Sequence, residues 1–267
     1  MNRIISRALK PSSPPFTRRA IHCLTFNTGS SSLKYSLHNI HRNSNHGFEG
    51  TIVSTGLADR VGKDDISLTL DGSNIDIAPR SSHSDCLKAI SKSLPIPIEE
   101  VKVVGHRVVH GGSRFSEPTV ITPGILTAID EYSTLAPLHN PPAVKGISAA
   151  LDIFPSVPHV GVFDTSFHSS MPPSSYRYAV PSSLYDQGVR RYGFHGSSYA
   201  YVSSEASKIL NKPKPNLIVL HLGSGASMCC LKDGVSIDTT MGMTPAEVRS
   251  EGRLERSDSK AVYHRPT

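Results

Sequence analysis

Two short segments combine glycine with hydroxyl side chains directly after a strand-like stretch. The first is residues 27–34, with the sequence NTGSSSLK, where Gly29 lets the backbone approach an anion. Hydrogen-bond donors could come from Ser30, Ser32 and Lys34, which favours phosphate binding on a hairpin. It is not a Walker loop, because strand-like residues follow the lysine where a helix would be required. The alternative interpretation is a polar turn with a solvated lysine.

The second segment is residues 221–227, with the sequence HLGSGAS, another turn from a strand into glycines and hydroxyls. Each turn alone is a weak signal. Two such turns at two strand ends could hold a chain of phosphates from opposite sides, so together they suggest a nucleotide.

One charged residue lies inside an otherwise apolar predicted strand, and another lies at the end of one. Arg107 lies in GHRVVHGG, and a buried arginine needs an anion, which is either a structural carboxylate or part of a substrate. Asp164 ends the strand in VFDTSFH, where a carboxylate at a strand terminus commonly faces a site. Its alternative role is to cap a following helix.

A histidine between two glycines is the next candidate. His195 lies in RRYGFHGSS, just before a predicted helix, so its ring is free to project near the positive end of the backbone dipoles. A histidine in a flexible loop is the alternative. Residues 135–142, LAPLHNPP, form a rigid apolar turn that could wall a small pocket.

The histidines and cysteines do not indicate a metal centre. His106 and His110 are four residues apart on a predicted strand, which separates them by about 13 Å, too far for one ion to bridge. The four cysteines have no CxxC spacing, so we expect reduced, buried thiols rather than a zinc site or disulfides.

Strand and helix patterns alternate along the chain, so the predicted fold class is α/β. A β-meander opens it, with a turn at Asp71 and Gly72 between two short strands. The predicted strands cover residues 21–26, 32–40, 66–70, 75–77, 101–109, 160–164, 217–222 and 227–231. The predicted helices cover residues 84–93, 123–132, 143–151 and 197–210.

Charge is concentrated at the ends of the chain. The 267 residues carry a formal charge of +6, yet residues 23–247 hold 18 basic and 19 acidic side chains. A neutral body argues against nucleic-acid binding. The longest apolar run, residues 217–220, is far below the roughly 20 residues of a membrane helix, so no membrane protein is indicated.

Both ends differ from the middle. Residues 1–21 contain spaced arginines, serines and prolines and no acid, which is typical of a transit peptide into a mitochondrion or plastid. A disordered leader of a cytoplasmic protein is the alternative. Residues 248–267 show neither helical nor strand periodicity and are expected to be a tail.

Seven motifs in order make the chain resemble the acetate kinase family, within the superfamily of acetate and sugar kinases, Hsc70 and actin. They are NTGSSSLK, GHRVVHGG, LAPLHNPP, VFDTSFH, RRYGFHGSS, HLGSGAS and DTTMGMTP. The resemblance covers about residues 22–247. It implies an actin-like, ribonuclease H-like ATPase fold, with a first domain over residues 22–210 and an incomplete second domain over residues 211–247.

The resemblance also implies roles for individual residues. Asn27 looks like the magnesium-site asparagine, Asp164 like the catalytic aspartate, and His195 like the transition-state stabiliser. Arg107 resembles the arginine on the substrate side. The hydrophobic wall that accepts a methyl group corresponds to Val109, Leu138 and Pro245. The two phosphate loops correspond to Ser30, Ser32 and Lys34, and to His221, Gly223, Ser224 and Gly225.

The implied reaction is reversible phosphoryl transfer between ATP and acetate, giving acetyl phosphate and ADP, with Mg²⁺ as cofactor and a homodimer as the family's assembly. A carboxylate is already a nucleophile, so alignment and charge neutralisation should suffice. Asp164 would then hold a water of the metal or orient Arg107. Propionate in place of acetate, and pyrophosphate in place of ATP, stay open.

Two departures from the family pattern stand out. Ser224 replaces an asparagine of the second loop. After Glu247 the family motif breaks, and Leu254 stands where the family has a second site arginine. Two functions therefore stay open: the kinase, and a non-catalytic truncated remnant or gene-model fragment of one.

Overall fold

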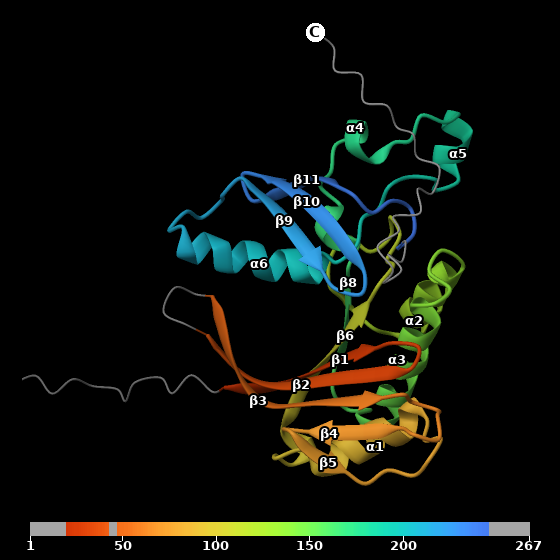
Figure 1. The fold of residues 1–267 in the computed structure, drawn as a ribbon, viewed down its shortest axis with the longest axis vertical. Helices are drawn as coiled ribbons and strands as arrows, with labels where there is room; N and C mark the ends of the chain where they lie inside the picture. Colours follow the sequence, from red (N-terminus) through yellow and green to blue (C-terminus); the bar gives the residue numbers. More distant parts are fainter. Residues whose placement is uncertain (1–19, 43–46, 246–267) are drawn as a thin grey trace, which may run out of the picture.

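A computed structural model describes residues 20–42 and 47–245 and shows two β-sheets with helices packed on them (Figure 1). The expected leader, residues 1–21, lies almost entirely outside the described residues, and the expected tail, residues 248–267, lies wholly outside them.

The large sheet has eight strands in the order β5-β4-β3-β2-β1-β6-β8-β7. Its first half is an antiparallel meander. In its second half β6 lies parallel beside β1 and β8 parallel beside β6, while the short edge strand β7 runs antiparallel to β8. The strands are β1 (Ile21–Thr28), β2 (Ser32–Arg42), β3 (Phe48–Asp59), β4 (Ser67–Leu70), β5 (Ser73–Ile75), β6 (Val101–Val108), β7 (Thr119–Val120) and β8 (His159–Phe163).

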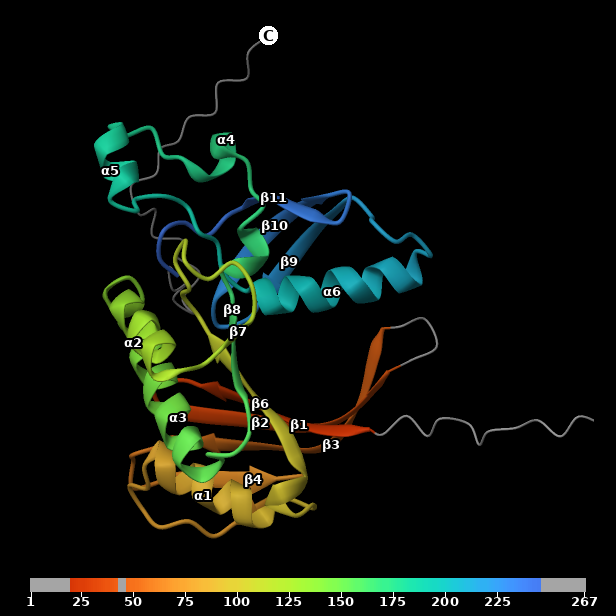
Figure 2. The same cartoon turned by 180° about the vertical axis from the view of Figure 1, so that it is seen from behind.

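One face of this sheet carries the main core. Along β1 the side chains of Leu24, Phe26 and Thr28 are buried, since alternate residues of a strand point to the same face. The helices α1 (His83–Ser93) and α3 (Asn140–Ile153) pack on this face, and α2 (Pro123–Glu131) packs beside α3 (Figure 2).

The small sheet has three antiparallel strands in the order β11-β10-β9. They are β9 (Leu217–Leu222), β10 (Ala226–Lys232) and β11 (Val235–Thr239). Helix α6 (Gly196–Ile209) packs under one face of this sheet, on the side of the large sheet (Figure 1). The short helices α4 (Pro173–Tyr176) and α5 (Ser182–Asp186) lie in the long connection before α6.

The predicted elements are present except for the strand expected over residues 75–77, where the structure instead has β5 over Ser73–Ile75, directly after the turn at Asp71 and Gly72. The other differences have local causes. Helix α3 starts at Asn140 rather than at residue 143, because Pro141 and Pro142 occupy its first turn, where a missing N–H costs nothing. Residues 135–142, which were expected to form a rigid apolar turn, are therefore partly helical. Asp71 and Gly72 both have positive φ, as a two-residue hairpin turn between β4 and β5 requires.

The cysteines within the described residues are free, as expected, although only two of them are buried. Cys86 and Cys229 are buried, while Cys23 and Cys230 are half-buried. Among the described helices, none has the length and apolar character to cross a membrane.

Candidate active site

The carboxyl ends of three neighbouring parallel strands bring three of the predicted residues together. Asn27 lies at the end of β1, Arg107 near the end of β6 and Asp164 directly after β8. Their neighbours Phe26, Val108 and Phe163 are buried toward the helices, so the polar side chains face the other way. Open α/β sheets commonly bind ligands at the carboxyl ends of their strands.

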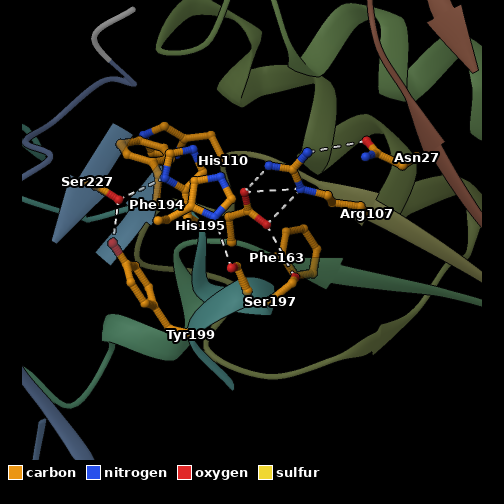
Figure 3. A network of polar contacts seen from close by, with 12 residues as sticks. Asn27, Arg107, His110, Phe163, Phe194, His195, Ser197, Tyr199 and Ser227 are labelled. Carbon is orange, nitrogen blue, oxygen red and sulfur yellow. Dashed lines mark hydrogen bonds and ion pairs between the residues drawn. The ribbon is translucent and has the colours of Figure 1, made fainter. Parts of the chain in front are cut away.

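Arg107 and Asp164 form a two-point ion pair. Arg107 Nε donates to Asp164 Oδ1 at 3.0 Å, and Nη2 donates to Oδ2 at 2.6 Å. Nη1 donates to Asn27 Oδ1 at 3.3 Å (Figure 3). Burial opposes the charge of Arg107, but the Asp164 carboxylate offsets this and raises the pKa of Arg107.

The anion that Arg107 needs is thus a carboxylate of the chain. Asp164 is fully buried, whereas the Arg107 side chain is 33% exposed. A guanidinium has five N–H donors, and the pair uses only part of them. Asp164 therefore orients Arg107 and leaves donors for a ligand anion.

His195 stands at the start of α6 in a left-handed backbone conformation, with φ 59°. The next residue, Gly196, donates its N–H to the Asp164 carbonyl at 3.1 Å, and a Cβ on it would lie 2.1 Å from that oxygen. Only glycine allows this approach. The Ser197 hydroxyl also donates to Asp164 Oδ1 at 3.3 Å. The turn thus ties His195 to Asp164.

The second predicted phosphate loop holds the His195 ring. His195 Nδ1 lies 2.7 Å from Ser227 Oγ, and the ring stacks on His221 with centroids 4.0 Å apart. Burial, followed by the neighbouring His221, lowers the pKa of His195 to about 4. His195 is therefore neutral at pH 7. His221 Nδ1 in turn lies 2.9 Å from Ser198 Oγ.

The tip of this loop, at Gly223 and Ser224, is open to solvent. Gly225 packs so closely that a Cβ there would be 3.3 Å from His195 Nε2. The structure thus joins the glycine loop and the histidine turn, which the sequence presents as separate motifs, into one cluster.

The first phosphate loop lies beside Arg107. Lys34 on β2 pairs with Asn27 on β1, so the two side chains share the face that carries Arg107. Ser30 is exposed and Ser32 half-buried, and the Gly29 carbonyl lies 2.9 Å from His83 Nε2 at the start of α1. A groove of about 330 Å³ begins at Lys34 and runs away from Arg107 across β3 and β4.

The three residues of the predicted hydrophobic wall come from segments that meet at His110. Val109 precedes His110 and is half-buried, as is Pro245, while Leu138 is 60% exposed. Asn140 bonds both the N–H and the carbonyl of His110, and His110 Nε2 lies 3.0 Å from the Met243 carbonyl. The fully buried His110 thus links all three segments.

Sequence reasoning missed several contributors to this cluster. Ser227 bonds His195, Tyr199 bonds Ser227, and the ring of the fully buried Phe194 packs edge-on against His110. Ser227 does stand in HLGSGAS, but its pairing with His195 depends on how β10 lies against α6. The available signal was that Tyr199 falls in the first turn of the helix predicted directly after His195; in the structure its N–H donates to the His195 carbonyl at 3.1 Å.

His106 and His110 occupy different environments. His106 lies on the buried face of β6, where its Nε2 is 2.9 Å from His159 Nδ1. Across residues 20–42 and 47–245, no group of three or more His, Cys, Asp and Glu side chains could hold a metal ion by itself.

Known proteins resemble this chain over most of its length. A model of the Acetokinase family matches residues 22–252. The acetate kinase of Deinococcus radiodurans is 46% identical over 232 residues, which is 84% of this chain and 56% of that protein. The acetate kinase of Alkaliphilus metalliredigens is 43% identical over 238 residues, 84% of this chain and 58% of that protein.

Solved structures agree with the sequence comparison. A propionate kinase from Francisella tularensis has a TM-score of 0.77 at 39% identity, covering 84% of this chain and 58% of that one. The acetate kinase of Porphyromonas gingivalis has a TM-score of 0.72 at 37% identity, covering 85% and 58%. The fold is therefore the actin-like one that the motifs implied. The chain spans less than three fifths of the length of these relatives, and it belongs to the acetokinase family.

Proposed function

We propose that these residues serve reversible phosphoryl transfer between ATP and a short carboxylate, acetate first, giving acetyl phosphate and ADP. The observation that carries the proposal is the partly exposed, fixed guanidinium of Arg107 beside the neutral ring of His195. Acetate kinases at 43–46% identity support it.

Each side chain has a task that its surroundings support. Asp164 orients Arg107, whose remaining N–H groups can bind the acetate carboxylate or the transferred phosphoryl group. Phosphoryl transfer needs positioning and charge stabilisation rather than a base, since a carboxylate attacks without losing a proton. His195, neutral at pH 7, would donate to a phosphoryl oxygen.

The chemistry of the donor set fits a magnesium ion. Mg²⁺ takes oxygen ligands and is usually held by one or two carboxylates together with substrate phosphates. Asn27 Oδ1 and the Asp164 carboxylate are such oxygens at one sheet edge. When bound, the ion would neutralise charge on the phosphates, and these two side chains would hold it directly or through its waters.

The wall of Val109, Leu138 and Pro245 would receive the alkyl group of the substrate. The similarity to a propionate kinase makes propionate the second candidate acceptor. One additional methylene is worth only about 1–3 kcal/mol of discrimination in a pocket, so both acids should be compared.

The proposal is tested on a completed enzyme, in which residues 1–247 are followed by the corresponding C-terminal part of the Deinococcus radiodurans relative. Acetyl hydroxamate formation is measured with acetate, propionate and butyrate, with Mg²⁺ and either ATP or pyrophosphate. Product with a two- or three-carbon acid supports the proposal. No product with any acid from a folded enzyme contradicts it.

A further inference from the structure

We propose that Tyr199 and Ser227 fix His195 as the tautomer whose ring proton sits on Nε2, so that this nitrogen donates into the phosphoryl site. Tyr199 and Ser227 are thus positioning residues for His195. The benefit to catalysis rests on the function proposed above, whereas the tautomer itself does not.

The three side chains form a short relay of hydrogen bonds. Tyr199 Oη lies 2.5 Å from Ser227 Oγ, and Ser227 Oγ lies 2.7 Å from His195 Nδ1 (Figure 3). Tyr199 is fully buried and Ser227 is 4% exposed. Both hydroxyls are therefore kept from water, and their hydrogen-bond partners are each other and the His195 ring.

Counting hydrogens gives the relay its direction. Within the described residues, Ser227 Oγ is the hydrogen-bond partner found for the Tyr199 hydroxyl. Burial raises the pKa of Tyr199, so the phenol keeps its proton and donates it to Ser227. The single hydroxyl proton of Ser227 then goes to His195 Nδ1, which must be unprotonated to accept it. The ring proton is left on Nε2.

The reverse direction would strand a buried donor. If His195 carried its proton on Nδ1, Ser227 would accept it and donate to Tyr199, and the Tyr199 proton would have no acceptor among the described residues. A buried donor without a partner is costly. Protonating His195 on both nitrogens carries the same penalty, because Nδ1 would again become a donor.

The other side of the ring faces the reaction groups. His195 interacts electrostatically with Asp164 and Arg107, and in Figure 3 its ring lies between Ser227 and Arg107. An N–H at Nε2 would bind a phosphoryl oxygen, whereas a lone pair there would repel it. A neutral ring also leaves Asp164 paired with Arg107.

The placement of the relay follows from two elements. Tyr199 lies in the first turn of α6, directly after His195, and its N–H donates to the His195 carbonyl at 3.1 Å. Ser227 on β10 pairs with His221 on β9, the residue on which the His195 ring stacks. The β9–β10 hairpin therefore fixes both the orientation of the ring and its proton.

The test reads the proton position directly. The full chain is labelled with ¹⁵N-histidine, and two-bond ¹H–¹⁵N spectra at pH 7.5 show which ring nitrogen is protonated, with His195→Gln assigning the signals. We expect His195 to carry its proton on Nε2. In Tyr199→Phe the preference for Nε2–H should fall by roughly fivefold, which corresponds to the net worth of one hydrogen bond.

Tyr201→Phe is the matched control, because it removes the same hydroxyl from an exposed position on the same helix and should leave the tautomer unchanged. A proton on Nδ1 in the unsubstituted chain overturns the relay, and this result needs no variant to fold. A folded Tyr199→Phe chain with an unchanged preference overturns it too. Because the spectra contain no substrate, a failed acetyl phosphate assay would leave this result standing.

Discussion

Arg107 is the residue on which the proposed chemistry depends most. Replacing Arg107 by alanine in the completed enzyme should lower kcat by roughly 100-fold or more, the scale expected when a preorganised charge is removed from a developing anion. Arg114→Ala is the control, since Arg114 is an exposed arginine whose nearest carboxylate, on Glu131, is 3.9 Å away. Equal turnover in both variants would make the Arg107–Asp164 pair purely structural.

His110 offers a residue-scale test of the hydrophobic wall. The Gly112 N–H donates to its Nδ1 at 3.0 Å, so its proton lies on Nε2 and is donated to the Met243 carbonyl. His110→Phe removes this link to the segment that carries Pro245. We expect KM for acetate to rise about tenfold, the scale of one misplaced apolar contact, with a smaller change in kcat.

Steady-state kinetics of the completed enzyme measure this effect. His38→Phe is the control, because His38 is half-buried on β2, away from the wall segments. If kcat fell and KM stayed constant in His110→Phe, His110 would act on the chemical step and not on the wall.

At the scale of elements, the close contact between the His195 turn and the end of β8 should be sensitive to one methyl group. A Cβ at Gly196 would collide with the Asp164 carbonyl, so Gly196→Ala should destabilise the fold by about 1–3 kcal/mol. Gly124→Ala is the control, since a Cβ there meets nothing within 4 Å. Urea unfolding measures both, and equal effects would show that the turn relaxes freely.

The elements near the site were largely predictable from the sequence, because apolar runs and glycine turns bound them. Strand β3 was not predicted, since much of it is exposed and Ile52 and Val53 are adjacent rather than alternating. Helix α6 was predicted to within a residue at each end. What the sequence did not reveal was contact between elements: Ser227 reaches His195 only because the β9–β10 register places it there.

The buried histidines make the stability of the whole molecule depend on pH. Burial, followed by the neighbouring His159, lowers the pKa of His106 to about 3, and burial also lowers the pKa values of His159 and His168. In the unfolded chain these groups have pKa values near 6.5, so below that pH only the unfolded chain gains protons. The contribution of these histidines to the free energy of unfolding is therefore fully present above about pH 6.5 and is lost as the pH falls further.

Urea unfolding between pH 7.5 and 5 measures this loss, which approaches about 1.4 kcal/mol per pH unit for each such group. His106→Gln should be less stable at pH 7.5 but should show a shallower pH dependence. His41→Gln is the control, because the side chain of His41 is 43% exposed and lies outside the buried group. An unchanged slope in His106→Gln would mean that other groups cause the acid loss.

The small sheet bears on the activity of the molecule as a whole. Its face away from α6 exposes Ile218, Leu220, Leu222 and Met228, with Ile218 at 73% and Leu222 at 78%. Soluble proteins rarely leave such a contiguous apolar face uncovered. The relatives are nearly twice as long as the matched part of this chain, so in them further residues are available to cover the corresponding face.

We therefore expect the 267-residue chain on its own to form no measurable acetyl phosphate, because an open site admits water that weakens every electrostatic contribution to phosphoryl transfer. The exposed face should also bind a hydrophobic dye. Replacing Ile218 and Leu222 by threonine should reduce dye binding without restoring activity, since the site would stay open. The hydroxamate assay on this chain beside the completed enzyme decides the matter: comparable turnover would show that residues 20–245 and the ends that flank them already close the site.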